Sequence, residues 1–102
     1  DVFINVVGGM RVTETAADLP MLMALHSSYR DHPLSDKMVS FGEVGLSGEI
    51  RPVPDGEQRL REAAGHGYTT AVIPAANAPR KKIGALEVIA VNHVQAVLEK
   101  VF

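Results

Sequence analysis

The length of 102 residues and the hydrophobic share of 46% fit one globular domain with a single core, and leave no room for a second. The formal net charge of −2 excludes a general electrostatic attraction to nucleic acid or to an anionic membrane, so such binding requires a local cluster of Lys and Arg. The sequence has no cysteine and no apolar run of about 18 residues, which excludes disulfides, thiolate metal sites and a membrane-spanning helix; we expect a soluble, cytoplasmic protein with no membrane partner.

The N-terminal third of the chain is predicted to form a buried strand followed by a helix. Residues 2–7 are mostly β-branched and precede two glycines, which is typical of a buried strand. Across residues 16–30 the apolar side chains occupy several sides of a helix, and we expect this central helix to be covered on more than one face. Thr15 and Asp18 resemble a capping box at its start, and Pro33 follows its end.

The middle of the chain favours two strands and a second helix. Residues 39–44 and 46–53 are rich in strand-forming side chains, and the glycines between and within them predict a hairpin or two adjacent antiparallel strands. Asp55 and Gln58 resemble a second capping pair, and the short amphipathic helix that follows is expected to end at Gly65.

The C-terminal third is predicted to contain two strands and a closing helix. Residues 70–73 favour a strand ended by a proline, residues 75–84 an exposed connection, and residues 86–91 the last strand. Asn92 and Gln95 resemble a third capping pair, and apolar side chains at helical spacing follow them. The predicted fold is therefore a single α/β (α+β) domain with three helices and one mixed sheet.

One segment of the predicted hairpin resembles the Gly-Glu, Gly and Pro core of the Lon proteolytic domain: residues 41–53, Phe-Gly-Glu-Val-Gly-Leu-Ser-Gly-Glu-Ile-Arg-Pro-Val. ComM-like magnesium-chelatase homologues have a similar core. Four further segments are similar to the C-terminal Lon-protease-like domain of the RadA (Sms) family of bacterial DNA repair proteins: Asn-Val-Val-Gly-Gly at 5–9, Thr-Glu-Thr-Ala-Ala-Asp-Leu at 13–19, Glu-Ala-Ala-Gly-His-Gly at 62–67 and Pro-Ala-Ala-Asn at 74–77. The resemblance implies one Lon-like domain over residues 1–102.

The resemblance also implies where a peptidase of this type would carry its catalytic serine and lysine. The serine position falls on Ala16, and the lysine position falls on or beside Glu57. Alanine has no nucleophile, and a carboxylate cannot replace an amine as the base. With a two-residue slip in the alignment, Arg59 would take the lysine position, but a guanidinium does not lose its proton at usable pH. We therefore expect no peptidase activity from this domain.

What the family implies beyond this domain is a hexameric, RecA-like, DNA-dependent ATPase that binds single-stranded or branched DNA and drives branch migration together with the recombinase machinery. The sequence has neither a phosphate-binding Walker loop nor the four cysteines of the family's zinc finger. ATP, magnesium and zinc are therefore expected only in other parts of such a protein. Because the chain begins at Asp1 inside a predicted strand, we expect it to be a fragment of a longer protein.

The basic side chains are the candidate DNA contacts. Arg80, Lys81 and Lys82 form the densest cationic run and could bind phosphates, although a solvated loop explains them equally simply. Weaker candidates are Arg51, Arg59 and Arg61. Arg61 stands four residues after Glu57, and this spacing predicts a helix-surface ion pair instead.

The four histidines are scattered without the spacing of metal ligands, and we expect no metal or cofactor in this domain. The main functional prediction is a non-catalytic scaffold and oligomerisation domain, with DNA contacts, of an ATP-dependent DNA repair and recombination protein. The alternative is the pseudo-protease domain of a ComM-like helicase of the magnesium-chelatase type. A third hypothesis is a residual serine hydrolase whose catalytic residues are distant in the sequence and come together only in the folded chain.

Overall fold

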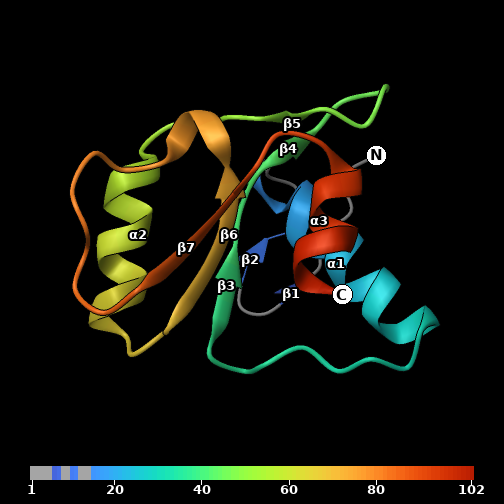
Figure 1. Cartoon of the computed structure of the whole chain (residues 1–102), viewed down its shortest axis with the longest axis horizontal. Coiled ribbons are helices and arrows are strands. Elements are labelled where there is room, and N and C mark those ends of the chain that lie inside the picture. The colour runs from blue at the N-terminus through green and yellow to red at the C-terminus, as the bar shows by residue number, and fades with distance from the viewer. Residues whose placement is uncertain (1–5, 8–9, 12–14) are drawn as a thin grey trace.

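The computed structural model describes residues 6–7, 10–11 and 15–102 (Figure 1). Within these residues there are three α-helices, two short 3₁₀ helices and seven strands. In chain order they are β1 (Val6–Val7), β2 (Met10–Arg11), η1 (Thr15–Ala17), α1 (Asp18–Tyr29), β3 (Met38–Ser40), β4 (Glu43–Val44), β5 (Ile50–Arg51), α2 (Gly56–Gly65), β6 (Thr70–Pro74), η2 (Ala75–Asn77), β7 (Glu87–Val91) and α3 (Val94–Val101).

The strands pair in both directions. β3, β6 and β7 form a parallel sheet in that order, with β6 in the centre. β4 and β5 form an antiparallel hairpin, and β1 and β2 form a second antiparallel pair. The predicted α/β class with three helices and mixed strand directions is confirmed. The part of the first predicted strand before Val6 lies outside the described residues.

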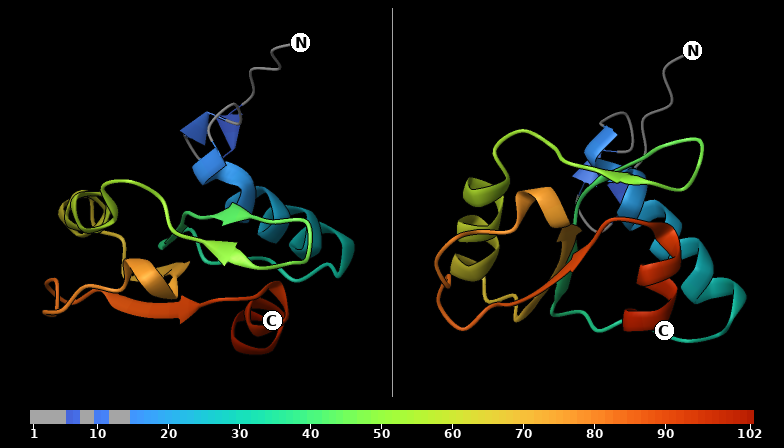
Figure 2. Two further views of the ribbon diagram at one scale, coloured as in Figure 1. Left: turned by 90° about the horizontal axis from the view of Figure 1, so that it is seen from above. Right: turned by 45° about the horizontal axis from the view of Figure 1, so that its top comes forward.

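Helices cover both faces of the parallel sheet, and strand alternation decides which residue faces which helix. On β6, Ala71 and Ile73 face α2, while Val72 faces α1 and α3 on the other side (Figure 1, Figure 2). The core on the α2 side contains Ala16, Phe41, Val53, Leu60, Ala71, Ile73 and Leu86. The core on the other side contains Leu19, Met23, Ile50, Val72, Val91 and Val97. The sheet therefore separates two small cores of one domain.

The predicted single strand over residues 39–44 is divided into β3 and β4, because the chain turns at Gly42. Its φ of 152° is unfavourable for other residues, and an added Cβ would lie 3.2 to 3.3 Å from atoms of Pro74, Ile50 and Leu19. The Gly42 amide donates to Ala16 O, and Gly42 O accepts from Leu19 N, both at 2.9 Å. This turn moves the chain out of the parallel sheet and into the hairpin.

All three predicted side-chain caps are wrong. α1 begins after Ala17 with no side-chain cap, and Asp18 Oδ2 instead accepts a hydrogen bond from Val44 N at 3.1 Å. Asp55 precedes α2 in the left-handed region, at φ 61°, and makes no cap bond. At α3 the cap is His93 rather than Asn92, and its Nδ1 accepts from Gln95 N at 3.2 Å. Of these, only Asp18 is diverted to a partner far away in the chain, which a local capping pattern cannot predict.

The prediction that the first helix is covered on more than one face is also wrong. Leu19 and Met23 are buried, but Leu25 is 67% exposed and Tyr29 is 84% exposed. Leu19 and Met23 are four residues apart and, with the partly buried Leu22, form the one face of the helix that packs on the core. None of the described helices is long and apolar enough to cross a membrane.

Candidate functional site

The basic run lies in the connection between η2 and β7. Arg80, Lys81 and Lys82 are all exposed there, as predicted for residues 75–84. Within the described part of the chain, no carboxylate lies within ion-pair distance of any of the three. Their charges are therefore available to an anionic ligand.

Both ends of this connection are fixed to the body of the domain. At the start, the Asn77 amide forms two hydrogen bonds with the backbone of Val53: Oδ1 accepts from Val53 N at 2.9 Å, and Nδ2 donates to Val53 O at 3.0 Å. A Cβ at Gly56 would lie only 2.5 Å from Asn77 Nδ2, so the start of α2 packs closely against this amide. At the other end, Leu86 is buried and its amide donates to Ile83 O at 3.1 Å. The cations thus project from an anchored loop.

This loop shares a hollow with helix α2. The hollow has a volume of about 750 Å³, and its charged lining residues are Glu57, Arg61, Arg80, Lys81 and Lys82. A second hollow of about 510 Å³ lies on the β7 side of the same loop and also has the three loop cations on its wall. Four cations from two elements distant in sequence therefore border one concave surface. We call these four residues, Arg61, Arg80, Lys81 and Lys82, the basic surface.

Arg61 differs from the other members of the basic surface because it has a partner. Its guanidinium donates to the carboxylate of Glu57, one turn earlier on α2, which confirms the predicted ion pair. Both side chains are more than half exposed. The Glu57–Arg61 pair is therefore solvent-exposed, and both of its residues line the hollow.

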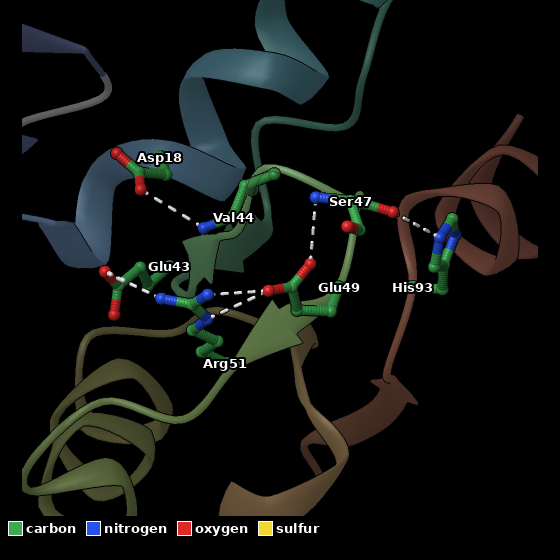
Figure 3. Close-up of polar contacts among 7 residues, drawn as sticks. All are labelled: Asp18, Glu43, Val44, Ser47, Glu49, Arg51 and His93. Carbon is green, nitrogen blue, oxygen red and sulfur yellow. Dashed lines mark hydrogen bonds and ion pairs between the residues drawn. The ribbon is translucent and has the colours of Figure 1, made fainter.

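The other two arginine candidates are not part of the basic surface. Arg59 Nε donates to Pro54 O at 3.0 Å, and its guanidinium carbon lies 5.8 Å from the centre of the Phe41 ring, within reach of a cation–π contact. Arg51 lies between two carboxylates, 2.6 Å from Glu49 Oε2 and 3.9 Å from Glu43 Oε2 (Figure 3). Each of these arginines has a partner within the domain.

The hairpin around Arg51 is a polar cluster that the sequence analysis missed. Its ion pair is supported by the backbone, because Glu49 Oε1 also accepts from Ser47 N at 3.1 Å (Figure 3). A hydrogen bond from its own backbone and one from Arg51 lower the pKa of Glu49, and the same carboxylate raises the pKa of Arg51. His93 Nε2 lies 3.0 Å from Ser47 O and joins the turn to the start of α3. The Glu-x-Arg spacing was the available signal, since residues two apart lie on one face of a strand.

The two positions of the expected peptidase dyad have structural surroundings. Ala16 is 4% exposed and belongs to the core on the α2 side. Glu57 lies in the first turn of α2 and pairs with Arg61. Among the described residues no serine hydroxyl is hydrogen-bonded to a lysine amine, and no group of three His, Asp or Glu side chains is arranged to hold a metal.

Comparison of the sequence with known proteins places this chain in a family. The family model described as subunit ChlI of Mg-chelatase matches residues 1–77, and the chain belongs to this family. Proteins named DNA repair protein RadA match over the whole chain: the one from Escherichia coli K12 is 54% identical over 98 residues, or 96% of this chain, and the one from Pseudomonas aeruginosa is 51% identical over 102 residues, or 100%. The RadA protein of Aquifex aeolicus is 46% identical over the same 100%.

These relatives confirm the resemblance to RadA proteins. The chain covers 21% of the Escherichia coli protein and 22% of each of the other two, so it spans about a fifth of the length of these relatives. The description of the matched family fits the alternative prediction, a domain of the magnesium-chelatase type. The name of the relatives agrees with the main prediction, a domain of a DNA repair protein.

Proposed function

We propose that the chain is a non-catalytic scaffold, oligomerisation and DNA-contact domain of an ATP-dependent DNA repair and recombination protein. One observation carries the DNA contact: three cations of an anchored loop and Arg61 of α2 border one hollow, and the loop cations have no carboxylate partner among the described residues. Relatives named for DNA repair match this chain from end to end at 51% and 46% identity, which supports the repair role.

The proposed ligand of the basic surface is the phosphate backbone of single-stranded or branched DNA. Lys and Arg bind phosphates as charges and as hydrogen-bond donors, and such contacts are independent of base sequence. The overall charge of −2 does not oppose this, because the contact depends on local charge. In a ring of copies, proposed to be a hexamer, the surface would be repeated around the assembly, and weak contacts would act together.

The domain itself is proposed to be without catalytic activity. A methyl group at Ala16 and a carboxylate at Glu57 stand at the positions that the Lon-like resemblance gives to a serine and a lysine. ATP, Mg²⁺ and Zn²⁺ would bind to other parts of the full-length protein, which would supply the ATPase activity. The domain would contribute assembly and a binding surface.

The test is to neutralise the loop in the full-length protein with Arg80→Gln, Lys81→Gln and Lys82→Gln together. We expect the affinity for a fluorescent oligothymidylate to fall about tenfold or more at physiological salt. The slope of log K against log salt concentration should become shallower by about 2, because each lost contact to a single strand removes about 0.7. Fluorescence anisotropy at a series of salt concentrations measures both quantities.

The matched control neutralises three cations elsewhere: Arg30 after α1, Lys37 before β3 and Lys100 in α3. It changes the net charge equally, so it corrects for the general field of the protein. An unchanged affinity and slope in the loop variant, or an equal loss in the control, would show that the loop is only a solvated connection.

The family match supports a second candidate, a pseudo-protease domain serving a magnesium-chelatase-type helicase of the ComM kind. The two candidates differ in what adjoins the domain in the full-length protein. An upstream Walker loop and four-cysteine finger would support the repair ATPase, and a downstream magnesium-chelatase-like module would support the alternative. Sequencing the complete reading frame decides between them.

A further inference from the structure

The hollow next to the basic loop has one negatively charged residue in its lining. Its charged side chains are four cations and Glu57, which lies in the first turn of α2. A surface that binds phosphates gains nothing from a carboxylate at its edge, because like charges repel. Its contribution to the stability of α2 does not by itself explain why Glu57 lines a hollow whose other charged residues are cations.

The contact between Glu57 and Arg61 gives that explanation. The guanidinium of Arg61 is the hydrogen-bond donor and the carboxylate of Glu57 the acceptor, with the two side chains 66% and 56% exposed, respectively. An exposed pair of this kind is weak in water, so an arriving phosphate can compete with the carboxylate for the guanidinium. No carboxylate among the described residues lies within ion-pair distance of the three loop cations, although Glu87 lines the second hollow with them.

We propose that Glu57 is a positioning residue that restrains Arg61 and lowers the affinity of the basic surface for the phosphodiester backbone of single-stranded DNA. This inference rests on the proposed function, because it assumes that the basic surface binds DNA. The loop cations make the first contacts. Arg61 joins them only when a phosphate replaces Glu57 as its partner. One of the four cations, Arg61, is therefore paired with Glu57 when no DNA is bound. The weaker binding that results favours release of the DNA strand and rebinding at another position along it.

The experiment uses the full-length protein and the substitution Glu57→Gln. We expect the affinity for a fluorescent oligothymidylate to rise by about two- to fivefold. This range corresponds to the interaction energy of a weak, exposed ion pair, which no longer has to be broken. The dependence of log K on log salt should become steeper by about 0.7, since one more phosphate contact is made. A purely structural role in the helix would not change this slope.

Glu62→Gln is the matched control. Glu62 is an exposed glutamate on the same helix, and it does not line the hollow. The substitution changes the net charge equally, so it measures the general effect of removing one negative charge. The gain from Glu57→Gln over Glu62→Gln should disappear when Arg61→Gln is also present, because the restrained cation is then absent.

The inference is overturned if Glu57→Gln binds like wild type or like Glu62→Gln, or if its gain persists in the Arg61→Gln background. If the loop variant with Arg80, Lys81 and Lys82 replaced still loses affinity, the inference alone has failed and the DNA surface stands. If that loop variant binds like wild type, the proposed DNA contact itself has failed. The melting temperature of each variant, measured in parallel, identifies any loss of affinity that comes from unfolding.

Discussion

Two parts of the molecule carry an exposed arginine, and they differ in whether carboxylates lie next to its charge. In the connection before β7, Arg80 has two lysines beside it and no carboxylate partner among the described residues. In the β4–β5 hairpin, Arg51 lies between Glu43 and Glu49 (Figure 3). The first arrangement leaves positive charge for a ligand, and the second consumes it within the domain. Exposure of a cation therefore does not by itself indicate a binding site.

The reason for the difference lies in strand pairing. Glu43 and Arg51 are direct partners across the β4–β5 ladder. Glu49 immediately precedes β5, two residues before Arg51, where it forms an isolated β-bridge with His93. Cross-strand neighbours and residues two apart lie on one face, so the three charges meet. None of the described strands pairs with the loop before β7, which runs past α2 and lines a hollow with it (Figure 1).

The largest expected effect on this comparison comes from releasing the anchor of the basic loop. Asn77→Ala should lower the free energy of unfolding by about 1 to 3 kcal/mol, because Val53 is buried and would lose partners for both its amide and its carbonyl. Urea unfolding measures the change. Asn92→Ala, at an exposed position, should stay within about 0.5 kcal/mol of wild type. Equal effects of the two substitutions would show that the amide of Asn77 does not hold the loop.

A direct comparison of the two arginines should give an intermediate effect. In the full-length protein, Arg80→Gln should make the salt dependence of single-stranded DNA binding shallower by about 0.7 to 1, as expected for one phosphate contact. Arg51→Gln should leave it unchanged, because Arg51 lies between two carboxylates and does not line the hollow of the basic surface. Both variants change the net charge by the same amount, so each serves as the control of the other. A shallower dependence in Arg51→Gln would bring the hairpin into the DNA surface.

The smallest expected effect is the pH dependence of the hairpin. Because the pKa of Glu49 is lowered in the folded chain, its ionised form stabilises the fold above the ordinary pKa of 4.5. This contribution is lost as the pH falls through the lowered folded-state pKa. The difference in unfolding free energy between wild type and Glu49→Gln should therefore be present at neutral pH and shrink in acid. A difference that is constant with pH would show that the Arg51 pair adds no stability.

Much of the fold could be predicted from local sequence. The strands β6 and β7, the end of α2 and the start of α3 lie within a residue or two of the predicted positions. β6 ends at a proline and α2 at a glycine, whose backbone restrictions act locally, and the start of α3 follows from the helical spacing of its apolar side chains. The ion pair between Glu57 and Arg61 was predictable for the same reason, since a helix fixes residues four apart as neighbours.

The sequence alone therefore determined the α/β class, most of the elements, the exposed basic run and the resemblance to RadA proteins, because these depend on the order and spacing of nearby residues. Tertiary structure decided that Gly42 divides a predicted strand, that Asp18 binds Val44 instead of capping its helix, and that Arg51 is neutralised. It also brought Arg61 of α2 to the same hollow as the loop cations. Such contacts join residues far apart in the chain. Local sequence preferences do not specify them, because they form only when the sheet and its helices pack together.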